Sequence, residues 1–446
     1  MEDKKINANP TKRFFIEMLI RDIALEPAIA ELVDNSMDGI RLFRKNTGYK
    51  EECSIDVDFN KESFTIKDNC GGISIHDAKY YCFRFGRDND REFELSNGTG
   101  VFGIGMKRAL FRMGKVFDIY STTPREHFHI HIDVDEWLAD TNSDWTFAFD
   151  DIGENETNDY SVCGTEIRIT KLHDPISASF SNPYFRESFF NYIRQRCSTA
   201  KSLGLIININ DRTVQYIDEK ILFSDKFKPY VKNINVDDMK IRIIAGCAKL
   251  GNPQNAGWYI QCNHRMVLFA NQGEDTGWGT DGVPRFHGEF APFRGYVLFE
   301  SSNLEHLPWN TTKTGVDISS KYYQIALTVM KECTKLFSKW RNQVSEFLES
   351  SDGQVKAADI YTGVEKEVFS ETISNYVHDD NQFQFPLLND ENYPVPEEPR
   401  TTIRIIEKKS KIENIKQYYG RPKMTNQDVG KRIFDYFYER EIEEDE

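Results

Sequence analysis

The chain has 446 residues, which at about 150 residues per domain predicts roughly three domains and excludes a mini-protein. Its 56 basic and 71 acidic residues give a formal net charge of −15, so the average surface repels nucleic acids and acidic membranes, and only a local basic patch could reverse this. With 39% hydrophobic, 28% charged and 13% aromatic residues, the composition is typical of a soluble globular protein and excludes a disordered or fibrous one.

The cysteines and the N-terminus indicate a reducing compartment. The eight cysteines are scattered without a Cys-x-x-Cys pair, which argues against zinc fingers and a disulfide framework. The N-terminus lacks the apolar stretch of a signal peptide, and no run approaches the roughly 18 apolar residues that a membrane-spanning helix requires. We therefore expect a reduced, cytoplasmic protein that does not associate with membranes.

The first 200 residues predict a domain that combines helices with a mostly antiparallel sheet. Apolar residues recur at helical spacing from Pro27 to Arg44, and residues 46–48 can end that helix. Alternating apolar residues then predict a hairpin of two strands that ends at Asp68. The other elements predicted here are a helix over 106–113 and strands over 117–121, 127–134 and 165–170.

Residues 201–350 predict a second domain. Its expected strands cover 205–210, 242–247, 258–262, 265–269 and 296–300. A strongly periodic helix from Ser320 to about Leu348 closes this domain, and an ordinary core-facing helix explains its pattern better than a helix–helix interface.

The composition changes near residue 350, where we place a second boundary. Residues 351–399 contain 11 acidic and 2 basic residues, whereas residues 400–437 contain 10 basic and 4 acidic residues with aromatic residues between them. Residues 351–446 therefore predict a C-terminal region made of an acidic linker and a basic, aromatic helical segment.

A polar helix face is the first candidate for chemistry. The segment ELVDNSMDG begins at Glu31 and places Asn35 and Asp38 at positions i+4 and i+7, so all three project from one face of the predicted helix. Taken alone, such a face is more often a solvated stripe than a site.

Three further segments follow in order. DNCGGI, beginning at Asp68, puts an acid at the end of a strand beside two glycines, where a backbone can approach a flat ligand closely. GTGVFGIGMKRA, residues 98–109, is a glycine-rich loop that leads into a helix and could cradle phosphates. GTEI, residues 164–167, opens a strand. Each has an ordinary structural explanation, but four in this order favour a nucleotide site.

Together these segments resemble the motifs of the GHKL ATPase superfamily, which includes DNA gyrase B, MutL and MORC proteins, HtpG-type chaperones and sensor histidine kinases. The resemblance covers about residues 10–340, and ELVDNSMDG is most similar to the MutL and MORC motif. One departure is Cys70, which occupies the place of the first glycine in D-x-G-x-G and leaves Gly72 as the matched glycine. The resemblance implies an α+β protein: a Bergerat-type ATP-binding α/β sandwich over 1–200, a transducer domain of the ribosomal-protein-like α/β type over 201–350, and a small C-terminal region over 351–446.

The resemblance also implies roles for individual residues toward ATP and Mg²⁺. Glu31 would be the general base for water, and Asn35 would ligate Mg²⁺, with Asp38 matched to the same motif. Asp68 would bind the adenine amine, supported through water by Thr165. The lid residues expected at the phosphates are Gly100, Val101, Phe102, Gly103, Ile104, Gly105, Met106 and Lys107.

A second-domain segment adds an independent signal. HLPWNTTKTG, residues 306–315, resembles the transducer loop of gyrase B, MutL and MORC proteins, which implies that Lys313 reaches the γ-phosphate and acts in catalysis. A polar turn with a solvated lysine is the alternative. Residues 257–271 likewise resemble the transducer strand pair around Arg265.

These features predict a Mg²⁺-dependent ATPase with slow turnover, in which ATP drives dimerisation of a molecular clamp. By resemblance the process would be DNA-related, such as repair, restriction or phage defence, with DNA and a separate effector protein as candidate partners. The alternatives are an HtpG-like chaperone and an ATP-sensing regulatory or interaction subunit with little hydrolysis.

Overall fold

The computed structural model describes residues 10–21, 23–84, 105–140, 145–216, 220–310, 313–351, 355–368, 373, 383–389, 392–393 and 403–442. These residues belong to two compact units, one formed by residues 1–344 with 357–387 and one by residues 345–356 with 388–446. The first unit contains two large sheets. Among the helices of the described ranges, none combines the length and apolar character that crossing a bilayer requires.

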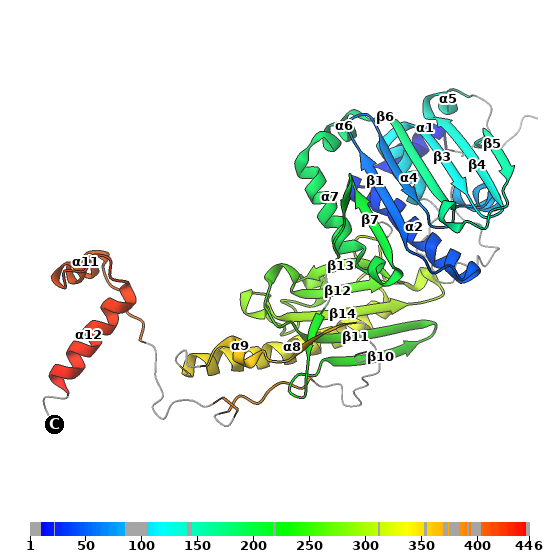
Figure 1. The fold of residues 1–446 in the computed structure, drawn as a ribbon. Helices are drawn as coiled ribbons and strands as arrows, with labels where there is room; N and C mark the ends of the chain where they lie inside the picture. The colour runs from blue at the N-terminus through cyan, green and yellow to red at the C-terminus, as the bar shows by residue number, and fades with distance from the viewer. Residues whose placement is uncertain are drawn as a thin grey trace, which may run out of the picture. The chain divides into compact units, whose positions relative to one another are not determined.

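The first sheet is antiparallel except at one pair of strands (Figure 1). Its order is β5-β4-β3-β6-β2-β1-β7-β8, and β1 and β7 are the parallel pair. This confirms the mostly antiparallel sheet predicted from the alternating apolar residues. The strands are β1 (Cys53–Phe59), β2 (Phe64–Asp68), β3 (Gly114–Thr122), β4 (Glu126–Asp133), β5 (Asp151–Glu154), β6 (Gly164–Leu172), β7 (Leu205–Ile209) and β8 (Arg212–Thr213).

The placement of β7 corrects one expectation. We expected residues 205–210 in the second domain, but β7 pairs with β1 in the first sheet, with Ile207 opposite Ile55. Alternation of apolar residues predicts a strand but does not choose its partner, because the pairing joins segments about 150 residues apart in the chain.

The helix α2 (Leu25–Thr47) contributes the main helical layer to the core of the first sheet. Ala28, Ile29, Val33 and Ile40 are completely buried on its apolar face. The helix ends at Gly48, which adopts a left-handed conformation with φ of 73° and donates its N–H to the carbonyl oxygen of Arg44. The helix predicted over 27–44 is therefore confirmed, together with its C-terminal stop.

The remaining helices of the first sheet region flank the strands. α4 (Gly105–Met113) confirms the helix predicted over 106–113, and it contacts α2. The others are α1 (Lys12–Ile20), α3 (Ile75–Asp77), α5 (Val134–Ala139), α6 (Asp174–Ser181) and α7 (Pro183–Arg196).

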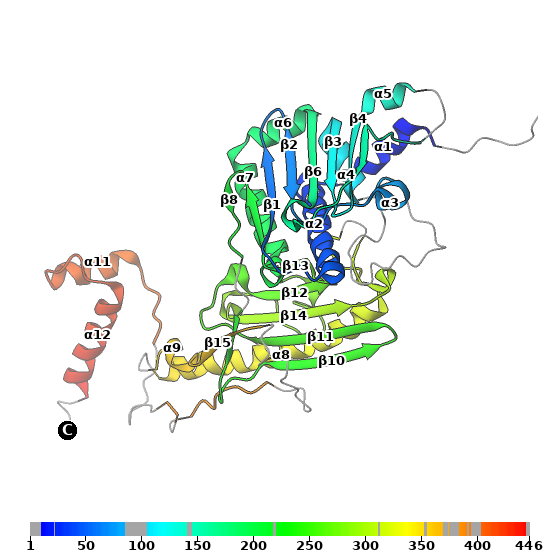
Figure 2. The same ribbon diagram turned by 45° about the vertical axis from the view of Figure 1, so that its right-hand side comes forward.

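The second sheet has the order β10-β11-β14-β12-β13 and is covered by the long helix α8 (Lys321–Ser350) (Figure 2). Trp258 Nε1 donates to Thr334 Oγ1 across 3.1 Å, and the rings of Phe293 and Phe337 lie 5.0 Å apart. α8 is thus a core-facing helix, as predicted. The strands are β10 (Tyr230–Val236), β11 (Met239–Cys247), β12 (Gly257–Cys262), β13 (Arg265–Asn271) and β14 (Phe293–Glu300).

Two smaller features complete the described chain. β9 (Lys220–Phe223) pairs with β15 (Val364–Glu367) in a separate two-stranded sheet. The short helix α9 covers Ala357–Ile360. In the second unit, α11 (Lys409–Tyr418) precedes α12 (Asn426–Glu441), whose N-terminus is closed by a capping box between Thr425 and Asp428.

Candidate functional site

The predicted polar face of α2 has two different environments. Glu31 and Asp34 are buried, with exposed fractions of 7% and 6%, whereas Asn35 is exposed. Asp38 is partly buried and forms an ion pair of 2.9 Å with Arg41, one turn along the helix. A carboxylate is buried in a protein only when it is paired, so the partners of Glu31 and Asp34 define this site.

Two cations from the region of the second sheet contact the Glu31 carboxylate. Arg265 Nη2, at the start of β13, donates to Oε1 across 2.6 Å, and Lys313 Nζ lies 3.4 Å from Oε2. Lys313 is only 4% exposed and has a positive φ of 52°. The fold therefore brings together the two residues that we proposed as catalytic, although they lie 282 positions apart in the sequence.

Asp34 joins the same group of charges. Its Oδ2 lies 2.8 Å from Arg265 Nη2 and 3.5 Å from Nε of Arg196 on α7. Burial raises the pKa of Asp34 to about 6, although the positive charge of Arg196 opposes the shift. Arg196 also donates to the backbone oxygen of Lys313 across 3.4 Å. We call Glu31, Asp34, Arg196, Arg265 and Lys313 the ionic cluster.

Three members of the ionic cluster were not predicted as site residues. Asp34 lies inside ELVDNSMDG and Arg265 lies in the strand pair noted above, so a search for further buried charges within the motifs could have found these two. Arg196 follows no motif, and its role is visible only from its contacts.

The Asp68 carboxylate is held in one orientation by three donors. Ser36 Oγ on α2 donates to Oδ2 across 2.5 Å, and the backbone N–H groups of Cys70 and Thr165 donate to Oδ1 across 2.9 and 3.2 Å. Burial raises the pKa of Asp68, and these hydrogen bonds oppose the shift. Thr165 thus contacts Asp68 through its backbone, and its support of adenine binding through water stays a prediction.

The two glycines after Cys70 are required by the backbone. Gly71 and Gly72 have φ values of 104° and 74°, and a Cβ atom on Gly72 would lie 2.1 Å from the carbonyl oxygen of Thr122. Cys70 is buried, and its φ is not positive. The departure from the family motif at Cys70 therefore occurs at a position where the backbone accepts a side chain.

The helix that follows the glycine-rich loop begins directly beside Glu31. A Cβ atom on Gly105, the first residue of α4, would lie 2.4 Å from Glu31 Oε2. Met106 is buried, and Lys107 Nζ donates to the carbonyl oxygens of Cys82 and Arg84 across 2.7 and 2.6 Å. The structure does not bring Lys107 to the ionic cluster. The predicted lid residues Gly100, Val101, Phe102, Gly103 and Ile104 lie outside the described residues.

The described residues suit a Mg²⁺ ion that is held mainly by phosphates and water, with few ligands from the protein. The described residues contain no group of three or more His, Cys, Asp or Glu side chains that could hold a metal ion. Asn35, exposed on α2 one turn after Glu31, offers a single amide oxygen. This suits Mg²⁺, because that ion is usually held by one or two protein oxygens together with phosphates and water.

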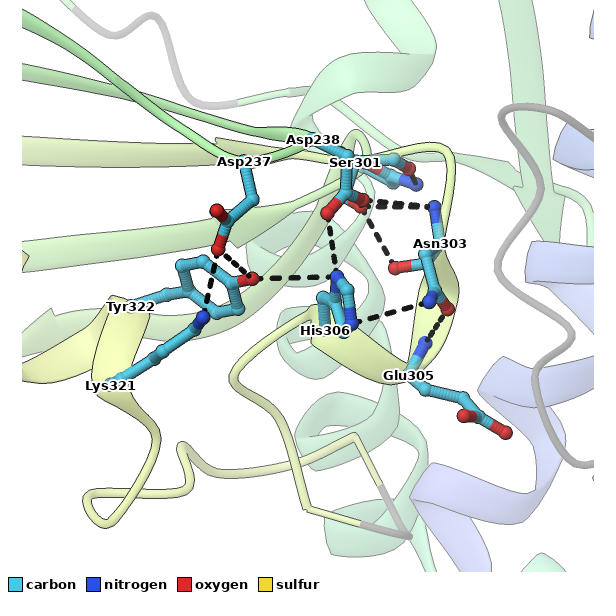
Figure 3. A network of polar contacts seen from close by, with 9 residues as sticks. Asp237, Asp238, Ser301, Asn303, Glu305, His306, Lys321 and Tyr322 are labelled. Carbon is cyan, nitrogen blue, oxygen red and sulfur yellow. Dashed lines mark hydrogen bonds and ion pairs between the residues drawn. The ribbon is translucent and has the colours of Figure 1, made fainter.

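A polar network supports the segment that leads to Lys313 (Figure 3). His306 Nδ1 lies 2.6 Å from Asp238 Oδ1, and Asn303 Nδ2 lies 3.3 Å from His306 Nε2. Tyr322 OH, at the start of α8, donates to Asp237 across 3.1 Å. The network fixes the start of the segment 306–315 to the β10–β11 turn and to α8, which limits where Lys313 can lie.

Residues 23–156 match the family model described as histidine kinase-, DNA gyrase B-, and HSP90-like ATPase. The matched range contains Glu31, Asn35, Asp68 and the glycine-rich loop, and it ends before Thr165 and Lys313. The match supports the GHKL superfamily for this part of the chain, and with it the binding and hydrolysis of ATP. The mixed α/β structure with its large sheet agrees with a GHKL ATPase domain. No curated protein shows significant similarity to the chain.

Proposed function

We propose that this protein is a Mg²⁺-dependent ATPase of slow turnover whose two sheet regions respond together to the bound nucleotide. One observation carries the proposal. Lys313, which lies between β14 and α8, contacts Glu31 on α2 across 3.4 Å. A lysine that reaches the candidate base from another part of the fold can link the state of the nucleotide to the position of that part.

Each residue of the site has a task that fits its environment. Asp68, held by Ser36, Cys70 and Thr165, can accept the exocyclic amine of adenine. Asn35 would ligate Mg²⁺, which neutralises phosphate charge when it is bound. Glu31 can orient and deprotonate the attacking water, and Lys313 can compensate negative charge on the terminal phosphate.

The test compares the wild-type chain with Glu31→Gln, which retains a side chain of similar shape. We expect phosphate release to fall by at least about a hundredfold, because the general base is lost, while ATP remains bound. The matched control is Glu26→Gln in the first turn of α2, away from the ionic cluster. Unchanged phosphate release in Glu31→Gln would contradict the proposal, and ATP binding without any release in the wild type would identify an ATP-sensing subunit instead.

The proposed cycle includes ATP-dependent dimerisation, as in the clamp implied by the motifs. Size measurements with Mg²⁺ and ATP, made on the wild type and on Glu31→Gln, address this part. We expect a dimer in both, and a longer-lived one in Glu31→Gln because reopening requires hydrolysis. An unchanged oligomeric state with ATP would contradict the clamp but not the ATPase.

A role in a DNA-related process is the second candidate, and one feature of the C-terminal unit favours it. A pocket beside α12 is lined by Arg421, Pro422, Lys423, Met424, Asp428, Lys431, Arg432 and Asp435. Tyr418 is 86% exposed nearby in sequence, and the Arg432 guanidinium lies 5.1 Å from the ring centre of Tyr419. Cations interleaved with exposed aromatic rings suit the phosphates and bases of nucleic acids.

A further inference from the structure

The ionic cluster engages both oxygens of the candidate base. Arg265 Nη2 lies 2.6 Å from Glu31 Oε1, Lys313 Nζ lies 3.4 Å from Oε2, and Glu31 is 7% exposed. The first residue of α4, Gly105, closes another side of the same carboxylate. In this arrangement both carboxylate oxygens of Glu31 already contact cations, so a water molecule has to share the carboxylate with them.

Asp34 offers Arg265 a second carboxylate. One nitrogen, Nη2, lies 2.6 Å from Glu31 and 2.8 Å from Asp34, and the Arg265 side chain is 1% exposed. Its Nε and Nη1 atoms have no hydrogen-bond partner among the described residues. A guanidinium buried in this way depends on a carboxylate neighbour, because leaving it unpaired would be costly. If Glu31 is released, Asp34 is the carboxylate already in contact.

The balance of charge favours an additional anion. When all its members are ionised, the ionic cluster contains the cations Arg196, Arg265 and Lys313 and the anions Glu31 and Asp34, an excess of one positive charge. Arg196 links Asp34 to Lys313, since it lies 3.5 Å from the Asp34 carboxylate and donates to the backbone oxygen of Lys313. A phosphate arriving beside Lys313 would compete with Glu31 for its ammonium group.

We propose that Arg265 is a positioning residue that holds Glu31 in an inactive ion pair until the terminal phosphate of ATP is bound, and that Asp34 then retains Arg265. This inference rests on the proposed function. Lys313 moves from Glu31 to the phosphate, Arg265 remains with Asp34 alone, and Glu31 becomes able to orient water. Arg265 itself touches neither ATP nor the water in this scheme.

The decisive experiment measures kcat and KM for ATP from steady-state hydrolysis in Asp34→Asn, Arg265→Gln and the double variant. Asp34→Asn removes the alternative partner, so Arg265 stays on Glu31. We expect kcat to fall by about tenfold, the effect of one charged hydrogen bond, with little change in KM. In the double variant the restraint on Glu31 is gone, so kcat should recover to at least the level of Arg265→Gln.

The recovery indicates a positioning role when the free energy of unfolding of Asp34→Asn equals that of the double variant, because removal of both members of a buried ion pair would otherwise restore stability as well. The matched control is Arg294→Gln, since Arg294 is also a buried arginine of the second sheet but donates to the carbonyl oxygens of Ala291 and Phe293. Binding of ADP verifies that each variant is folded. If Arg265→Gln does not bind ADP, Arg265→Lys replaces it, because the lysine side chain is one bond shorter and its ammonium group does not reach the position of Nη2 between the two carboxylates.

A double variant slower than Asp34→Asn would overturn the inference, since Arg265 would then assist turnover. The same holds if Arg294→Gln reproduces the effects of Arg265→Gln. Failure of the proposed function is seen separately, in a wild-type chain that does not release phosphate from ATP, and the inference would fall with it. The expected result is a tenfold loss of kcat in Asp34→Asn that is restored by the second substitution.

Discussion

Gly72 and Gly48 have nearly the same positive φ, 74° and 73°, but their surroundings differ. A Cβ atom on Gly48 would meet no atom within 4 Å, whereas one on Gly72 would lie 2.1 Å from the backbone oxygen of Thr122. The first position requires glycine only for its dihedral angles. The second requires it for the close approach of two backbone segments as well.

This difference predicts unequal costs for the same substitution. Gly48→Ala should lower the free energy of unfolding by about 1 kcal/mol, the penalty of a left-handed alanine. Gly72→Ala should lower it by about 3 kcal/mol or more, because steric overlap adds to that penalty. Denaturation with urea measures both values. Equal losses would mean that the backbone beside Thr122 can move away at little cost.

His131 on β4 gives the molecule a pH-dependent contribution to stability. His131 Nδ1 lies 2.8 Å from Asp118 Oδ1, and this hydrogen bond raises the pKa of His131 above the ordinary value of 6.5, although partial burial opposes it. His129 contacts the same carboxylate from 3.2 Å. The protonated His131 therefore stabilises the folded state fully below pH 6.5, and this contribution is lost as the pH rises through the raised pKa.

We expect the free energy of unfolding of the wild type to fall, as the pH rises above about 6.5, relative to that of Asp118→Asn, which removes the carboxylate. The difference should be small, since 45% of the His131 side chain is exposed and solvent screens the pair. Asp135→Asn serves as the control because it also removes a carboxylate from an ion pair, but its partner is Lys115 and not a histidine. A difference that grows with rising pH would contradict the assignment.

At the scale of elements, one buried hydrogen bond joins α8 to the second sheet. Trp258 on β12 donates to Thr334 Oγ1, and both side chains are completely buried. Thr334 in turn donates to the carbonyl oxygen of Met330 within the helix. The contact fixes the rotation of α8 against the sheet, and thereby the position of Tyr322 in the network that precedes Lys313.

Thr334→Val keeps the shape of the side chain but leaves the indole N–H without its acceptor. We expect a loss of about 1–3 kcal/mol in the free energy of unfolding. Thr328→Val, on the exposed side of the same helix, also removes a hydroxyl that donates to a carbonyl oxygen four residues earlier and should change stability by less than about 0.5 kcal/mol. Equal effects would show that water or another group replaces Thr334 as acceptor.

For the whole molecule, the net charge of −15 opposes binding of nucleic acid, so any such binding must depend on a local surface. Arg421 and Lys423 line the pocket of the C-terminal unit, which also holds Lys431 and Arg432. Reversing two of these charges should weaken duplex DNA binding much more than reversing two exposed lysines elsewhere.

The test compares two double variants. The first combines Arg421→Glu and Lys423→Glu, and the control combines Lys61→Glu and Lys339→Glu, which changes the net charge by the same amount. If the pocket contacts phosphates, the slope of log affinity against log salt should fall by about two in the first double variant only. Equal losses in both would indicate a general charge effect, and no binding by the wild type would remove DNA from the candidate partners.

The sequence by itself determined the local elements and the candidate chemistry near α2. The period of apolar residues predicted α2, α4, α8 and the hairpin of β1 and β2, because burial of one face imposes the spacing of a helix or a strand. The order of the four motifs pointed to the GHKL superfamily, which the family match supports over residues 23–156.

Only the tertiary structure decided which distant segments meet. β7 joined the first sheet beside β1 because strand pairing depends on contacts that no local pattern encodes. Arg265 lies 234 positions from Glu31, and Arg196 belongs to no motif, yet both are in the ionic cluster. Burial of two carboxylates on α2 requires cations that the rest of the fold must supply, and the sequence near α2 specifies the need for these cations but not their source.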